Sequence, residues 1–203
     1  PFASSFEASK KRLHQVHVGD DAVAIMSGTD EAGRLWPTRA LTFRRLFVRG
    51  RSVAIGSADS GNVTDVLFIG CTIGDDEGSA AWAFKIKMHV NAPSHVSDVA
   101  IVNTHLGNIT SNTWQDSKCY PALQIGQNYG GAIVDPAKGQ PRIFNVSFVN
   151  VTAHATCTAG SFVGASAAHA IERLHFSDCD FRATAARPWQ LTNVSVDTCT
   201  SEN

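Results

Sequence analysis

Two adjacent carboxylates, Asp20 and Asp21, follow Gly19 and precede the apolar segment 22–26. Neighbouring side chains of a regular strand point to opposite faces, whereas a bend at Gly19 would direct both carboxylates outward. A carboxylate pair can hydrolyse a glycosidic bond, because one member protonates the leaving oxygen while the other activates water. The same Gly-Asp-Asp sequence recurs at residues 74–76. A solvated turn is therefore the alternative interpretation at either place.

Two lysines, Lys85 and Lys87, alternate with apolar residues in the segment 84–88. This spacing puts both ammonium groups on one face of a strand, where they could bind a carboxylated sugar. They could equally be the solvated charges of an exposed sheet edge. Downstream, the segment 124–129 ends in Tyr129, whose ring could stack on a sugar.

Composition excludes several classes of protein. The chain has 203 residues, of which 43% are hydrophobic and 17% charged, so it can bury a core and is not disordered. Its formal charge of -1 offers no basic field for a nucleic acid or an anionic membrane. The longest apolar run is about five residues, against the ~20 that a membrane helix needs. The pair His14 and His17 lacks further ligands at a usual spacing, so neither a metal nor a cofactor is expected.

Short alternating segments must provide the scaffold that positions these side chains. Six of them begin with an apolar residue and repeat it two positions later, at residues 41–43, 66–68, 99–101, 146–148, 174–176 and 194–196. Each predicts a strand with two apolar side chains on one face. The longest interval, from residue 99 to residue 146, predicts one additional coil, with a strand at 120–129.

The way in which these strands connect decides between two all-β folds. An antiparallel β-sandwich favours tight Asn-Gly or Asp-Gly hairpins, and the sequence contains neither dipeptide. Irregular repeats of twenty-odd to thirty-odd residues instead indicate a β-solenoid whose coils stack in parallel. The fold predicted is therefore an all-β parallel β-helix that forms a single domain over residues 1–203.

Four sequence elements, taken in order, resemble the polygalacturonase-like family of glycoside hydrolases (family 28). Residues 19–28 look like the family's Asp-Asp element, and Ala54-Ile55-Gly56-Ser57 is similar to its Ile-Gly-Ser. Lys85-Ile86-Lys87 stands where the family has Arg-Ile-Lys, and Gln127-Asn128-Tyr129 stands at its late Tyr. The family fold is a right-handed parallel β-helix. The resemblance implies that the chain is the C-terminal part of such a catalytic domain and lacks its N-terminal coils.

The resemblance also implies a role for each matching residue. Asp20 would be the general acid, and Asp21 would help to activate water for inversion at the anomeric centre. Lys85 and Lys87 would hold a substrate carboxylate, and Tyr129 would contact the sugar. Two departures accompany these roles: the family's third Asp would fall before Pro1, and its His is replaced by Arg51. An Arg supplies positive charge but cannot relay a proton at neutral pH.

The function predicted is a secreted or cell-wall hydrolase of pectin-like acidic polysaccharide. It is expected to act as a monomer without cofactor, metal, nucleic acid or membrane. The alternative is a β-helix that binds polysaccharide or serves a structural role without catalysis. Five sequons are consistent with a secreted glycoprotein, although Asn and Thr also suit turns, and they lie at Asn62, Asn108, Asn145, Asn150 and Asn193. The five cysteines permit two disulfides or none.

Overall fold

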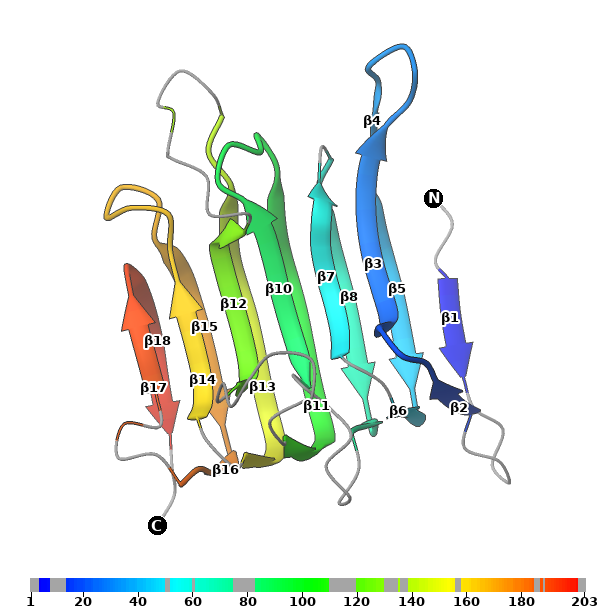
Figure 1. Cartoon of the computed structure of the whole chain (residues 1–203), viewed down its shortest axis with the longest axis vertical. Coiled ribbons are helices and arrows are strands. Elements are labelled where there is room, and N and C mark those ends of the chain that lie inside the picture. Colours follow the sequence, from blue (N-terminus) through cyan, green and yellow to red (C-terminus); the bar gives the residue numbers. More distant parts are fainter. Residues whose placement is uncertain are drawn as a thin grey trace.

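The computed structural model of this chain describes residues 4–7, 14–49, 52–59, 61–74, 83–109, 120–129, 135, 139–155, 158–184, 187 and 189–200. In this part of the chain every regular element is a β-strand, and the strands form two sheets (Figure 1). The predicted all-β class is confirmed.

The first sheet is a series of parallel strands that the chain visits in sequence order. Its main path is β1 (Ser4–Glu7), β5 (Thr38–Arg44), β8 (Val63–Ile69), β11 (His95–Ile109), β13 (Arg142–Ala155), β15 (Ile171–Ser177) and β18 (Val194–Thr200). Shorter strands extend it: β2 (His14–His17), β6 (Leu46–Arg49), β9 (Thr72–Ile73) and β16 (Asp180–Arg182).

The second sheet takes up the chain between successive visits to the first. Its parallel strands are β3 (Asp21–Thr29), β7 (Ser52–Asp59), β10 (Phe84–His89), β12 (Pro121–Tyr129), β14 (Thr158–Val163) and β17 (Trp189–Thr192). One short strand, β4 (Leu35–Trp36), pairs with β3 in the antiparallel sense at the edge of this sheet. Among the described strands β4 alone is antiparallel, so an antiparallel sandwich is excluded for this part of the chain.

Five of the six predicted segments lie in one register across the first sheet. Their first apolar residues form a single row, in the order Leu41, Val66, Val99, Val146 and Leu174. The sixth segment, in β18, joins this row through a shift that brings Val196 beside Leu174. The predicted parallel stacking is confirmed, because identical positions of successive segments are hydrogen-bonded neighbours.

The prediction of an additional coil between residues 99 and 146 is wrong. Strand β11 pairs directly with β13, so no strand of the first sheet intervenes. The strand expected at 120–129 exists as β12, but it belongs to the second sheet and pairs with β10 and β14. The spacing alone could not show this, because each round of the chain contributes one strand to each sheet. A strand of the second sheet therefore lies between two strands of the first sheet without adding a coil.

Left-handed residues recur in two columns across the first sheet, and the sheet bends at the second column. This second column consists of Arg45, Gly70, Asn103, Asn150 and Asp178, with φ of 52°, 64°, 49°, 50° and 54°. Asn and Asp tolerate this conformation better than other side chains, and Gly tolerates it best. The Asn150 Nδ2 donates a hydrogen bond to the Asn103 Oδ1 at 2.8 Å, so the bend also carries a side-chain ladder.

Phenylalanine side chains fill the interior between the two sheets. Phe43 stacks on Phe68 with ring centroids 4.6 Å apart, and Phe148 stacks on Phe176 at 4.9 Å. Phe84, from the second sheet, meets Phe68 edge-on at 5.7 Å and Phe148 at 6.4 Å. One hydrophobic cluster is therefore shared by both sheets. It fixes which face of β10 points outward.

Candidate functional site

The lysines of β10 point away from the core because their neighbours point into it. Phe84, Ile86 and Met88 are fully buried, so Lys85 and Lys87 lie on the opposite face, as their spacing predicts. Lys87 has glycines beside it in register on both neighbouring strands, Gly56 in β7 and Gly126 in β12. Neither glycine carries a side chain that could cover the lysine.

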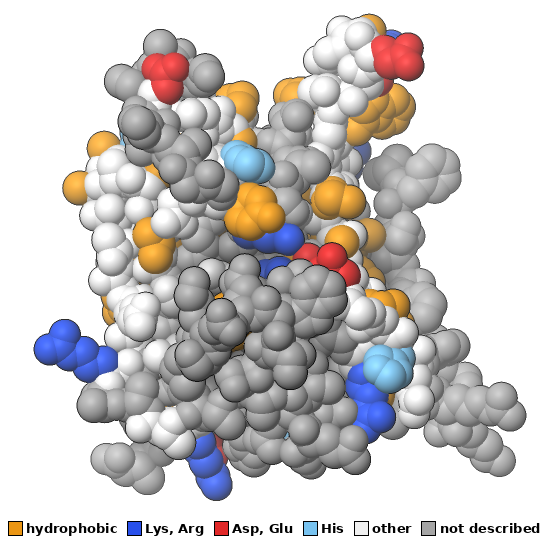
Figure 2. Space-filling model, viewed as in Figure 1, with side chains coloured by type: hydrophobic (Ala, Val, Ile, Leu, Met, Phe, Trp, Pro, Cys, Tyr) orange, Lys and Arg blue, Asp and Glu red, His pale blue; other side chains and the backbone are white. Residues whose placement is uncertain are grey.

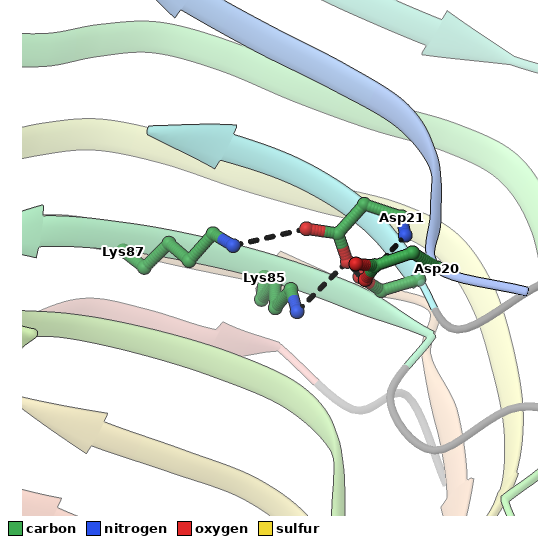
Figure 3. Close-up of polar contacts among 5 residues, drawn as sticks. Asp20, Asp21, Lys85 and Lys87 are labelled. Carbon is green, nitrogen blue, oxygen red and sulfur yellow. Dashed lines mark hydrogen bonds and ion pairs between the residues drawn. The ribbon is translucent and has the colours of Figure 1, made fainter. Parts of the chain in front are cut away.

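Asp21 brings the two lysines together (Figure 3). Its Oδ1 lies 2.8 Å from the Lys85 Nζ, and its Oδ2 lies 2.9 Å from the Lys87 Nζ. Ser52, the register partner of Asp21 on β7, donates a hydrogen bond from its hydroxyl to the Asp21 Oδ1. The side chains of Asp21, Lys85 and Lys87 are 14%, 7% and 15% exposed. The ion pairs are therefore shielded from most of the solvent.

Two opposing effects set the pKa of Asp21. Burial raises the pKa, because a desolvated carboxylate is less stable. Hydrogen bonds from Lys85, Ser52 and Lys87 together outweigh burial and hold the pKa below its ordinary value of 3.8. Asp21 is thus ionised at neutral pH. It cannot be the group that donates a proton to a leaving oxygen.

Asp20 lies in a different environment from its neighbour. The chain bends at residues 19–20, immediately before β3, as the glycine predicts. Asp20 is exposed, and its Oδ1 accepts a hydrogen bond from the backbone N–H of Asp21 at 2.8 Å. Asp20 is therefore the more exposed of the two carboxylates, whereas Asp21 is held by the lysines.

An aromatic side chain borders the lysine pair. The Lys87 Nζ lies 5.2 Å from the centroid of the Tyr129 ring, within the range of a cation–π contact. The His89 ring meets Tyr129 edge-on, with centroids 5.2 Å apart. Tyr129 is 43% exposed, so part of its ring is available to a ligand.

Sequence reasoning assigned no role to His89 or to the Ser52 hydroxyl. His89 follows Lys87 by two residues, so the spacing that put both lysines on one face could have predicted its position as well. No local signal links Ser52 to Asp21, because the two are 31 residues apart.

The remaining predicted residues do not join this group. Arg51 and its proposed positive charge lie outside the described residues, as does the side chain of Ser57. Arg44, the last residue of β5, and Arg49, the last residue of β6, belong to strands of the first sheet. These arginines therefore lie on a different sheet from Lys85 and Lys87.

Charged side chains gather on the face that carries the site. In the space-filling view, basic and acidic side chains lie side by side near the middle of this face (Figure 2). Within the described residues, no group of three or more His, Cys, Asp or Glu side chains is arranged to hold a metal ion. The described part also contains no helix of the length and apolarity that spans a membrane.

Comparison with models of known protein families gives no match, and comparison with curated proteins gives none either. The resemblance to family 28 glycoside hydrolases therefore rests on the sequence motifs alone.

Proposed function

We propose that this protein is a glycoside hydrolase that cleaves pectin-like acidic polysaccharide, acts outside the cell or in the cell wall, and folds as a right-handed parallel β-helix. The convergence of Asp20, Asp21, Lys85, Lys87 and Tyr129 on one face carries the proposal. These residues come from three strands and the bend before β3, and they are the residues that the motifs singled out.

The strand order supports the fold in this proposal. The chain alternates between two sheets, and like positions of successive rounds pair in parallel register. Coiled stacking of this kind defines a β-solenoid. Parallel strands joined by crossover connections are nearly always right-handed, which favours the right-handed form.

The two carboxylates suit different steps of hydrolysis with inversion. The motif match assigns Asp20 as the general acid that protonates the glycosidic oxygen. Asp21 is ionised and accepts hydrogen bonds, so it is assigned to orient and polarise the attacking water. Lys87 is the more accessible lysine and would meet a uronate carboxylate, while Lys85, 6% exposed, would hold Asp21 in place. Arg51 retains the role of an additional positive charge.

One observation favours a second candidate, a site that binds polysaccharide without cleaving it. Both oxygens of Asp21 are already engaged by Lys85, Lys87 and Ser52. A carboxylate held in this way is a weak base toward water. A binding protein would keep the lysines and Tyr129 for recognition and would need no proton transfer.

One assay distinguishes hydrolysis from binding without cleavage. Purified protein is incubated with polygalacturonate, and new reducing ends are measured for the wild type, Asp20→Asn and Asp65→Asn. Asp65 is the matched control, because it is an exposed carboxylate on the first sheet. Loss of a general acid is expected to lower the rate by about 100-fold or more in Asp20→Asn and to leave Asp65→Asn unchanged. Full activity in Asp20→Asn would contradict its role. Binding of oligogalacturonate without cleavage by the wild type would favour the second candidate.

A further inference from the structure

A projecting loop between β3 and β4 is held in one conformation by Asp30. The Asp30 Oδ1 accepts hydrogen bonds from the backbone N–H groups of Ala32 at 3.0 Å and Arg34 at 2.8 Å. Its Oδ2 accepts another from the Arg34 Nε at 2.7 Å. The backbone closes the turn, with the Asp30 N–H donating to the Arg34 carbonyl and the Gly33 N–H to the Asp30 carbonyl. The loop is therefore organised before any ligand arrives (Figure 1, near the label β4).

This loop presents a tryptophan on the outer face of the second sheet. Trp36 lies opposite Gly28 in the antiparallel pair of β4 and β3, and directly paired residues share a face. The neighbouring Ser27 and Ile25 point inward, so Gly28, Met26 and Trp36 lie on the outer face. Trp36 is 61% exposed and Met26 is 50% exposed. Gly28 has no side chain to cover the indole.

The edge of the indole and its face have different surroundings. Hydrogen bonds from the backbone and side chain of Arg34 do most to lower the pKa of Asp30, and a hydrogen bond with the Trp36 side chain adds to them. The ring N–H is thus used within the loop, while 61% of the Trp36 surface remains exposed. An aromatic face of this kind matches the C–H face of a pyranose ring, which carries no charge.

Trp36 lies on the same outer face as the candidate site, on its far side from Tyr129. The strands run in the order β4, β3, β7, β10 and β12, so four strand spacings separate Trp36 from Tyr129. At about 4.8 Å for each spacing, the separation across the sheet is roughly 19 Å. Lys87 lies between them on β10. That span exceeds one sugar and requires a ligand of several linked rings.

We propose that Trp36 is a second stacking platform, which binds a sugar ring several units away from the ring at Tyr129 and Lys87. The inference rests on the proposed function, because it assumes a polysaccharide in the site. It adds that the site recognises a chain long enough to reach both aromatics. Contact at Trp36 is apolar, so its contribution to affinity does not weaken with salt, whereas the contribution of Lys87 does.

The test compares trigalacturonate with octagalacturonate, and binding is measured by calorimetry for the wild type, Trp36→Ala, Trp36→Phe and Leu35→Ala. Trp36→Ala is expected to weaken octagalacturonate binding about tenfold, the effect of one lost aromatic contact, and to leave trigalacturonate unchanged. Trp36→Phe restores most of the loss. Leu35 is the matched control, because it is 59% exposed on the same strand but alternates to the opposite face.

The outcomes separate this inference from the proposed function. Equal octagalacturonate affinity in Trp36→Ala and the wild type would overturn the platform while leaving the site at Lys87 intact. A loss of equal size for both lengths would also overturn it, because Trp36 would then act on the central site. A wild type that binds neither oligomer would overturn both proposals. Lys87→Met provides the separate check on the site, since it is expected to weaken binding of both lengths.

Discussion

The chemistry of the site depends on one carboxylate, Asp21, that forms ion pairs with two lysines. Lys85 is 6% exposed, and a charge at that depth is tolerated only when it is paired. The same contacts that keep Asp21 ionised also anchor β3 to β10 across the intervening β7. Asp21 therefore serves stability as well as any reaction. This double role is testable by substitution.

Replacing Asp21 by Asn is expected to destabilise the protein at pH 7 by about 3 kcal/mol, because Lys85 and Lys87 lose the carboxylate that both of them contact. Urea unfolding of the wild type and of Asp21→Asn would measure the difference. A second substitution, Lys85→Met, is expected to recover much of the loss by removing the buried charge. An Asp21→Asn variant as stable as the wild type would contradict this account.

The same ion pairs predict how stability depends on pH. The folded pKa of Asp21 is below its ordinary value of 3.8, so the unfolded chain binds the proton more readily. The contribution of Asp21 to the free energy of unfolding is thus complete above about pH 4 to 5, and it is lost as the pH falls through the folded pKa. The stability gap between the wild type and Asp21→Asn should be constant from pH 5 to 7 and should narrow at pH 3. If the difference in unfolding free energy between the wild type and Asp21→Asn increased at pH 3, this prediction would be contradicted.

At the scale of strands, the sequence predicted local positions well and long-range partners poorly. The period of two identified the inward residues of β5, β8, β11, β13 and β15, because their apolar side chains alternate with polar ones. The same period put Lys85 and Lys87 on one face. It could not assign β12 to the second sheet, nor predict Ser52 beside Asp21. Those partners depend on connections between strands, which carry no periodic signal.

The bend in the first sheet gives a prediction for a single strand position. Asn103 has a φ of 49°, and its exposed side chain accepts a hydrogen bond from Asn150. Asn103→Ala is expected to lower the free energy of unfolding by about 1 to 2 kcal/mol, because a Cβ without a local polar group is strained there. Asn103→Gly is the control, since Gly70 occupies the corresponding position on the neighbouring strand. It should lower the free energy of unfolding less than Asn103→Ala does. Thermal unfolding would rank the two. Equal losses would assign the effect to the hydrogen bond instead.

At the scale of the whole molecule, the two sheets are joined through the Phe side chains of their shared core. Phe84 of the second sheet touches Phe68 and Phe148 of the first, and it immediately precedes Lys85 in β10. The orientation of the lysines is therefore set by the interior packing of the same strand. If the sheets depend on each other in this way, they should unfold together and not in succession.

A double-mutant cycle on Phe84 and Phe148 tests this coupling between sheets. Both side chains are fully buried and meet edge-on, so the losses from Phe84→Leu and Phe148→Leu should fail to add by about 0.5 to 1.5 kcal/mol. Urea unfolding followed by circular dichroism and by tryptophan fluorescence should give coincident transitions for every variant. The control pair is Phe43 and Phe148, whose strands are three spacings apart in the first sheet, and its losses should be additive. Additive losses for Phe84 and Phe148, or two separate transitions, would mean that each sheet is stable without the other. The lysines on the outer face would then owe their orientation to β10 and its neighbouring strands alone.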